Sequence, residues 1–290
     1  MNFQSLIISN TPLYRPLAAL AAERRIVLFA GLPGVGKSLF LQQMALLAHE
    51  AERTVHLRQW DVTRTAFETD AILARYPEVD GITHAAIRKG VGLWARKAIQ
   101  HWHAVHTTPE HILIGEVPLI GNRLIELVQP LDDDVEALLA GEQTTFVLPV
   151  PTQEVRQVIE SARARTMANP QHAKEKADAS PYVLQRLWTE LYQVAQELQL
   201  VVGQANAASS QRYDPAIYAA VYQHLLQHRH CRTLSVDQVL PKVGSVYTLP
   251  IRVQEMVASG DEVAAQMRLV ERQWDSLELE RAVAAWYRFD

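Results

Sequence analysis

The sequence predicts an α/β fold built on a mainly parallel sheet of five strands. Five short apolar runs have the length of strands, and helical segments separate them along the chain. This spacing favours crossover connections, which join parallel strands. The first run, IVLFA, is apolar throughout, as expected for a strand covered by helices on both faces. The expected strands are residues 26–30, 55–60, 111–115, 145–150 and 233–236.

The segments between these runs carry helical patterns. Residues 181–200 repeat leucine and valine at steps of three and four, which indicates a face packed on the core. Thr152 and Ser180 are expected to cap the helices that follow them. The expected helices are residues 37–50, 81–105, 121–129, 152–166 and 181–200.

The chain is expected to end in a long helix from Asp261 to Asp290. Val263, Met267 and Val270 are among the apolar residues along one side of it, and core packing is favoured over a partner contact. The organisation predicted from these patterns is an N-terminal extension (1–24), a main domain (25–250) and a C-terminal helical extension (251–290).

Composition excludes several classes of function. The chain has 28 Lys and Arg against 32 Asp and Glu, a net charge of −4, which offers no general attraction to nucleic acid or anionic lipid. The single cysteine, Cys231, excludes an internal disulfide and a CxxC zinc site. No stretch approaches the roughly 18 apolar residues of a membrane span, and the N-terminus lacks the pattern of a signal peptide. We therefore expect a cytoplasmic protein with no nucleic-acid or membrane partner.

The most specific signal is GLPGVGKS, residues 31–38, directly after the first apolar run. It matches the phosphate-binding pattern G-x-x-x-x-G-K-[ST], and a chain of this length gives about 0.01 chance matches. Glycines let successive backbone N–H groups face one anion, and the following helix adds its positive end. The alternative is a glycine-rich turn that binds nothing. The expected nucleotide-binding residues are Gly31, Pro33, Gly34, Val35, Gly36, Lys37, Ser38 and Leu39, with Lys37 on the β and γ phosphates of ATP or GTP and Ser38 on Mg²⁺.

With this motif, residues 24–238 resemble the P-loop kinases of small molecules, a group that includes gluconate and adenylylsulfate kinases, chloramphenicol phosphotransferase and zeta toxins. The resemblance implies a P-loop NTPase three-layer sandwich, with ATP and Mg²⁺ as cofactors and a lid around residues 156–181. The motif by itself indicates only P-loop membership. The kinase assignment therefore depends on three further segments.

The first segment is WDVTR, residues 60–64, at the end of the second expected strand. Asp61 and Arg64 resemble a D-x-x-R arrangement found in several of these kinases. A carboxylate at this edge can accept the proton of an acceptor hydroxyl, and a guanidinium can hold an acidic substrate. The alternative is that Asp61 caps a loop and Arg64 is a solvated charge.

The second segment is HILIGEVPLIGNR, residues 111–123, in which an apolar strand leads to Glu116. The resemblance implies that Glu116 helps to bind Mg²⁺ near Ser38. Arg123 is a second candidate for orienting the acceptor. Alternatively, Glu116 forms an ion pair with a base such as Arg123.

The third segment, residues 155–176, carries Arg156, Arg163, Arg165, Lys174 and Lys176. The resemblance implies that arginines of this helix close over the phosphates, and we select Arg163 and Arg165 because they precede a polar excursion. A solvated basic helix face is the alternative.

Two histidine-rich stretches, HWHAVH (101–106) and HLLQHRHC (224–231), are interpreted as ordinary solvated or hydrogen-bonded histidines. His224 and His228 share a helix face, but Leu225 stands where a metalloprotease has glutamate.

Two functions follow from these patterns. The first is an ATP- and Mg²⁺-dependent phosphotransferase acting on a small-molecule hydroxyl or phosphate acceptor, with Lys37, Asp61, Glu116, Arg163 and Arg165 in catalysis. The alternative is a P-loop ATPase or GTPase that acts as a nucleotide-gated switch. Its protein partner, or a second copy of the chain, would contact the C-terminal helix. The absence of an N-K-x-D guanine motif favours ATP.

Overall fold

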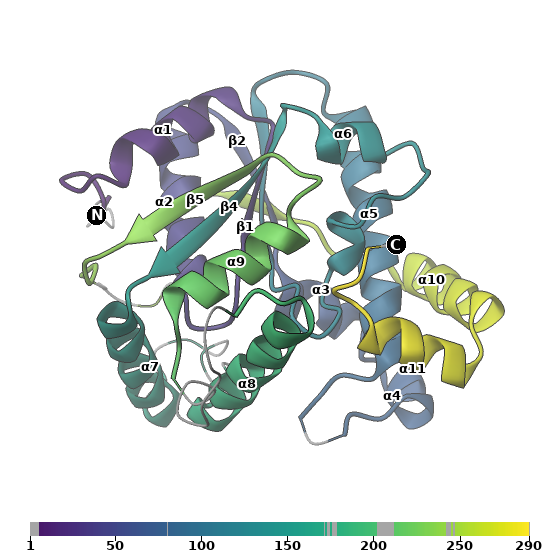
Figure 1. The fold of residues 1–290 in the computed structure, drawn as a ribbon. Helices are drawn as coiled ribbons and strands as arrows, with labels where there is room; N and C mark the ends of the chain where they lie inside the picture. Colours follow the sequence, from purple (N-terminus) through teal and green to yellow (C-terminus); the bar gives the residue numbers. More distant parts are fainter. Residues whose placement is uncertain are drawn as a thin grey trace.

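The computed structural model describes residues 6–79, 81–170, 172, 175, 179–201, 212–241, 245 and 247–289. It has an α/β fold with one parallel sheet and helices on both faces of that sheet (Figure 1). The strands are β1 (Ile26–Ala30), β2 (Thr54–Arg58), β3 (His111–Val117), β4 (Thr144–Pro151), β5 (Cys231–Val236) and β6 (Val253–Glu255). The helices are α1 (Tyr14–Glu23), α2 (Lys37–Glu50), α3 (Trp60–Phe67), α4 (Asp70–Arg75), α5 (Ala85–Val105), the 3-10 helix η1 (Ile125–Leu127), α6 (Glu136–Ala140), α7 (Gln153–Ala168), α8 (Pro181–Glu197), α9 (Pro215–Leu225), α10 (Gly260–Gln273) and α11 (Ser276–Ala284).

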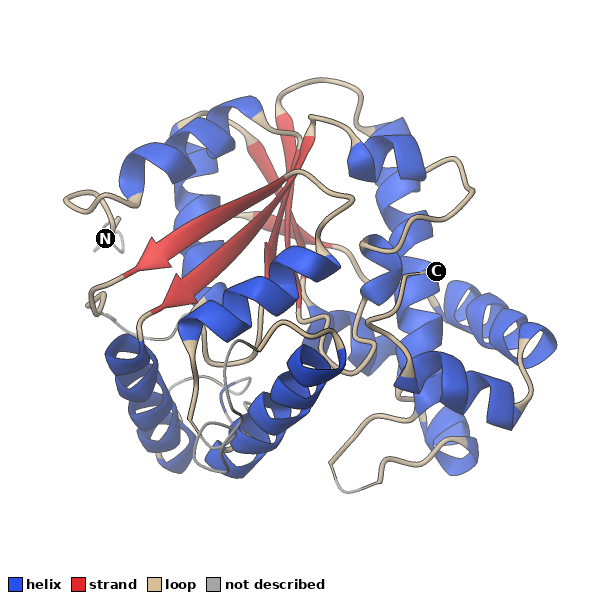
Figure 2. Cartoon of the chain, in the orientation of Figure 1, coloured by secondary structure: helices blue, strands red, loops and turns tan. Residues whose placement is uncertain are grey.

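The strand order is β5-β4-β1-β3-β2-β6, and the strands of every hydrogen-bonded pair run parallel (Figure 2). The five expected strands are present, but the expectation of a five-stranded sheet is wrong because β6 adds a sixth at the edge beside β2. Its sequence, VQE, is short and largely exposed, so no apolar run marks it. β2 also ends earlier than expected, because Trp60 begins α3.

Two hydrophobic cores lie on the two faces of the sheet, and β1 contributes to both. Ile26, Leu28 and Ala30 belong to the core under α5, α8, α9 and the C-terminal helices. Val27 and Phe29 belong to the core under α1 and α2. The period of two along a strand produces this division, and it explains why all of IVLFA is buried.

Several expected helices are confirmed, including their caps. The side chain of Thr152 accepts a hydrogen bond from the Val155 amide at 3.3 Å, and Ser180 accepts one from the Val183 amide at 3.3 Å. The expected helix over 121–129 is wrong except for the single turn of η1. Gly121 and Leu124 have positive φ angles of 63° and 67°, which are incompatible with a right-handed helix.

The chain ends in two helices, so the expectation of one long helix is wrong. Trp274 is extended, with φ −134° and ψ 133°, and Asp275 then caps α11. Val263, Met267 and Val270 are buried and belong to the core that contains α5. The apolar stripe therefore packs within the chain, as favoured from its pattern. Asp290 lies outside the described residues.

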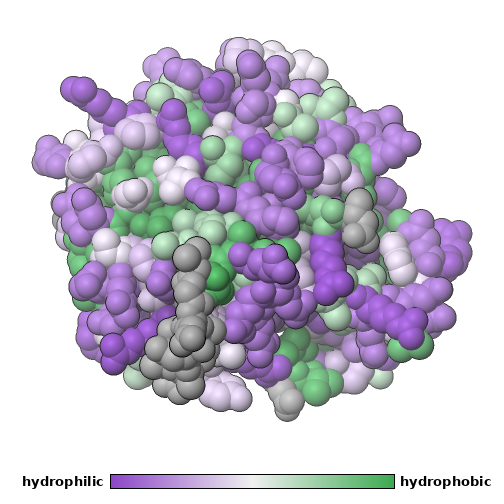
Figure 3. All heavy atoms as spheres, viewed as in Figure 1, coloured by the Kyte–Doolittle hydropathy of each residue, from purple (hydrophilic) through white to green (hydrophobic). Residues whose placement is uncertain are grey.

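Hydrophilic side chains form most of the face shown in Figure 3. The net charge of −4 is small for a chain of 290 residues. Among the described residues, no helix combines the length and the apolar character needed to cross a membrane.

Candidate functional site

Residues 31–38, called the glycine-rich loop below, connect β1 to α2. The φ angles of Gly31, Gly34 and Gly36 are 146°, 87° and 91°, a region of backbone conformation that side chains disfavour. Gly36 is also the N-cap of α2, so the positive end of a 14-residue helix adjoins the loop. The glycines therefore shape a loop suited to an anion.

An aromatic side chain from α9, a helix far from the glycine-rich loop in the sequence, packs against this loop. A Cβ atom on Gly31 would lie 2.3 Å from the hydroxyl oxygen of Tyr218 on α9. The Tyr218 ring lies 5.6 Å from that of Tyr213 and 4.9 Å from that of Tyr222, between centroids. Burial raises the pKa of Tyr218 well above its ordinary value, so its hydroxyl stays neutral. The sequence pattern did not predict α9 or this contact.

Lys37 lies buried at the N-terminus of α2, and its ammonium donates a hydrogen bond to the Leu32 carbonyl at 2.9 Å. Burial lowers the pKa of Lys37 to about 8, while the negative charge of Glu116 acts to raise it. The fold thus holds a poorly solvated ammonium against the loop's own backbone, where an anion would stabilise its charged form.

Glu116 lies on β3 beside Phe29 of β1 and is buried. It shares a face of β3 with Ile112 and Ile114, which belong to the core under α2, so its carboxyl is on the side of Lys37. Burial raises the pKa of Glu116, and the Lys37 ammonium is the strongest opposing influence. The expected approach of Glu116 to the loop is confirmed, whereas no ion pair of Glu116 with Arg123 occurs within 4.0 Å in the described part of the chain.

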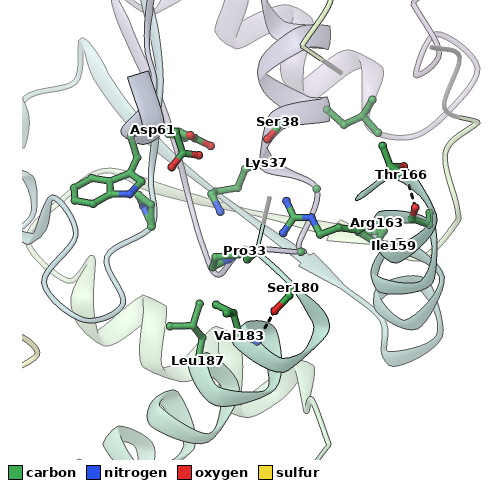
Figure 4. Close-up of a pocket in the computed structure, with 18 of the residues that line it drawn as sticks. Pro33, Lys37, Ser38, Asp61, Ile159, Arg163, Thr166, Ser180, Val183 and Leu187 are labelled. Atoms are coloured by element: carbon green, nitrogen blue, oxygen red, sulfur yellow. Dashed lines mark hydrogen bonds between the residues drawn. The ribbon is translucent and has the colours of Figure 1, made fainter. Parts of the chain in front are cut away.

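A cavity of about 480 Å³ opens above the loop, a volume in the range of small-molecule sites (Figure 4). Its walls come from the loop, α3, the end of β3, α7 and the start of α8. The side chain of Lys37 reaches into it from the loop (Figure 4). The residues expected in the site that line it are Pro33, Gly34, Gly36, Lys37, Ser38, Leu39, Asp61, Arg64, Glu116, Arg123 and Arg163.

Asp61 and Arg64 line the cavity from a helix rather than from the end of a strand. Asp61 is in the first turn of α3, and its carboxylate is 55% exposed and lies 3.8 Å from the Arg64 guanidinium. Arg64 also contacts Glu68 at 3.3 Å and the Thr83 hydroxyl at 3.2 Å. Asp61 therefore faces the open space of the cavity with a hydrated carboxylate.

The three arginines of α7 have different environments. Arg163 reaches into the cavity toward Lys37, on the other side of Lys37 from Asp61 (Figure 4). Arg165 is exposed and does not line the cavity, so the structure gives no support to its selection. Arg156 is buried, bonded to Glu160 at 2.7 Å and stacked 4.4 Å from the centre of the Tyr213 ring. Helical spacing alone could not distinguish them.

The expected lid extends over residues that are only partly described. Residues 171, 173, 174 and 176–178 lie outside the described residues, and Lys174 and Lys176 are among them. Ala179 and Ser180, directly before α8, are described and line the cavity. The end of the segment that leads into α8 therefore borders the site.

A second recess of about 290 Å³ adjoins the cavity and was not predicted from the sequence. It lies between α5, α8 and α11, and Arg123 and Leu187 belong to both spaces. A Cβ on Gly121, whose φ is 63°, would lie 2.9 Å from the Arg123 guanidinium and 3.3 Å from the Glu190 carboxylate. Its charged lining residues are Arg88, Arg123, Arg186, Glu190 and Glu280.

No protein-family model matches the chain, and neither a curated protein sequence nor a solved structure matches it. The geometry and charge of this site are therefore the basis for inferring function.

Proposed function

We propose that this protein is an ATP- and Mg²⁺-dependent phosphotransferase that acts on a small-molecule hydroxyl or phosphate acceptor. One observation carries the proposal: the poorly solvated ammonium of Lys37 lies in a loop of left-handed glycines and lines the same cavity as two carboxylates, Asp61 and Glu116. The loop proposed to bind nucleotide and the carboxylate proposed to accept the proton thus border one space large enough for a second substrate.

The triphosphate end of ATP would lie against the loop and the N-terminus of α2. The loop amides and Lys37 would neutralise the β and γ phosphates, and Arg163 would approach from α7. Ser38 and Glu116 would hold Mg²⁺, whose charge neutralises phosphate oxygens. The buried Glu116 carboxyl fits this role, because a cation would relieve the cost of its burial.

Phosphoryl transfer then depends mainly on the positions of the reacting groups. The oxygen of the acceptor hydroxyl attacks the γ-phosphorus, the bond from that phosphorus to the bridging oxygen breaks, and ADP leaves. The proton of the hydroxyl passes to the exposed carboxylate of Asp61. Arg163 stabilises the charge on the transferred group.

The acceptor would extend into the second recess. Three guanidinium groups there face two carboxylates, so the recess has a net positive charge. Burial and the neighbouring Arg123 lower the pKa of Arg88 to about 10, while the negative charge of Glu190 acts to raise it. An acceptor with a carboxylate or phosphate group would supply the negative charge that compensates these guanidinium groups. Arg123, at the junction of the two spaces, would orient it.

The switch alternative has less support. It requires the apolar stripe of the C-terminal helices to be available to a partner, yet Val263, Met267 and Val270 are buried in the chain's own core. α11 instead forms one wall of the second recess, through Glu280, Val283 and Ala284. α11 thus has a place in the proposed acceptor site.

The test measures ATP consumption with a panel of phosphorylated and carboxylated alcohols, sugars and nucleosides. We expect slow hydrolysis alone and much faster ADP formation with one acceptor class. With that acceptor, Asp61→Asn should lower kcat by roughly 100-fold or more while leaving ATP affinity nearly unchanged. Stimulation by a protein and by no small molecule would refute the proposal, and an undiminished rate in D61N would exclude Asp61 as the base.

A further inference from the structure

Three histidines from separate segments meet at the end of the sheet opposite the glycine-rich loop. His56 is on β2, His111 is the first residue of β3, and His106 is the C-cap of α5. In the parallel register Thr54 pairs with His111, so His56 and His111 are diagonal neighbours on one face. The loop follows the carboxyl end of β1, whereas this cluster lies toward the amino ends of β2 and β3.

The ring nitrogens are close enough to share one ligand. His56 Nε2 lies 3.1 Å from His111 Nδ1. One nitrogen from each of the three rings lies within 4.8 Å of the others. Two nitrogen ligands of a tetrahedral zinc ion lie about 3.4 Å apart, so small side-chain rotations would bring all three to bonding distance. Among the described residues, this is the one group of three or more His, Cys, Asp or Glu residues with such proximity.

Burial and aromatic packing define the surroundings of the cluster. Burial, together with His106 and His111, lowers the pKa of His56 to about 4. The Trp102 ring packs against His56 at 5.5 Å and against His106 at 5.7 Å between centroids. A neutral imidazole offers one lone pair, and a shift of tautomer moves its N–H to the other nitrogen.

A nearby positive charge limits the expected affinity. Arg25 stacks 5.5 Å from the centre of the Trp102 ring, and its guanidinium donates hydrogen bonds to the carbonyls of Thr107 and His106. Both partners are neutral carbonyls, so the guanidinium keeps its positive charge, which repels a dication. His106 and His111 are partly exposed, so water can complete the coordination.

We propose that His56, His106 and His111 form a binding site for one divalent transition-metal ion of the zinc class. Imidazole nitrogens suit Zn²⁺, Co²⁺, Ni²⁺ and Cu²⁺, while the lack of an oxygen ligand in the triad disfavours Mg²⁺ and Ca²⁺. The site joins β2, β3 and α5 at one point, and a bound ion would hold them together. It is independent of the nucleotide site.

The test is calorimetric titration of the untagged, chelator-treated protein with Zn²⁺ in the absence of nucleotide. We expect one Zn²⁺ per chain with a micromolar dissociation constant, and a Zn²⁺-dependent rise in the midpoint of thermal unfolding. His106→Gln and His111→Gln should each weaken binding at least tenfold and remove most of that rise. Co²⁺ should give visible absorption bands that these variants change.

The matched control is His101→Gln, because His101 is an exposed histidine on α5 outside the cluster. It should bind Zn²⁺ as the unaltered protein does. His56 is buried, so a His56 variant requires a circular dichroism check that it is folded. His106 and His111 are partly exposed, so H106Q and H111Q decide the test without the His56 variant. The proposal fails if the unaltered protein binds no Zn²⁺ at micromolar concentration, if H106Q and H111Q bind it equally well, or if H101Q loses binding.

Discussion

The buried pair of Lys37 and Glu116 should make the nucleotide-free protein less stable than a neutral equivalent. The pKa of Lys37 falls from an ordinary 10.5 to about 8. Since each pKa unit corresponds to about 1.4 kcal/mol, the buried ammonium costs the folded state roughly 3 kcal/mol at neutral pH. The raised pKa of Glu116 adds a cost of the same sign, because its ionised form is also disfavoured by burial.

We therefore expect the double variant Lys37→Met with Glu116→Gln to be more stable than the unaltered protein at pH 7. The double variant also loses the hydrogen bond from Lys37 to the Leu32 carbonyl. This loss should cost about 1 kcal/mol of the gain in stability. The net gain in the free energy of unfolding should be about 2 kcal/mol. Lys37→Met alone should gain less, because it leaves the Glu116 carboxylate buried without its counter-charge. Binding of ATP should be lost in both variants.

The pH dependence separates this mechanism from a general packing effect. Between pH 8 and 10.5, Lys37 is deprotonated in the folded protein and still protonated in the unfolded chain. The unfolded chain then binds more protons, so the stability of the unaltered protein rises with pH in this window. The advantage of the double variant should therefore be largest below pH 8 and shrink by roughly 3 kcal/mol toward about pH 10.5.

The assay is urea unfolding followed by circular dichroism at pH 7 and at about pH 10, without nucleotide. Lys97→Met, at an exposed position on α5, is the control and should show a difference that does not change with pH. A double variant less stable than the unaltered protein at pH 7, or an advantage that persists at the higher pH, would refute the reasoning.

Two further predictions concern the walls of the cavity. Gly31→Ala should destabilise the protein by about 2 kcal/mol or more, because its Cβ would lie 2.3 Å from the Tyr218 hydroxyl oxygen at a φ of 146°. Gly81→Ala, also at positive φ but with no atom within 4 Å, should cost about 1 kcal/mol in the same urea measurement; equal costs would contradict the role of Tyr218. Arg163→Ala should lower kcat for ATP turnover at least tenfold, because the guanidinium faces the phosphate site, whereas the exposed Arg165→Ala should stay within about twofold. A steady-state ADP assay distinguishes them, and equal effects of the two changes would count against Arg163.

The sequence by itself determined the elements whose signals are local. IVLFA is a strand because all five residues are apolar, and GLPGVGKS curls because its glycines adopt angles that side chains disfavour. Thr152 and Ser180 cap helices through bonds to amides three residues away. The adjacency of Glu116 to the loop also followed from strand positions, since parallel strands end at one edge of the sheet.

Tertiary structure alone decided the features that depend on contacts between distant residues. Tyr218 supports Gly31 although the two residues are far apart in the sequence, and no local pattern encodes that contact. The choice of Arg163 over Arg165 depends on how α7 rotates against the sheet. His56, His106 and His111 become neighbours only when two strands and a helix end come together. The physical reason is that backbone preferences act within a few residues, whereas burial and charge depend on whatever the completed fold brings within a few ångströms.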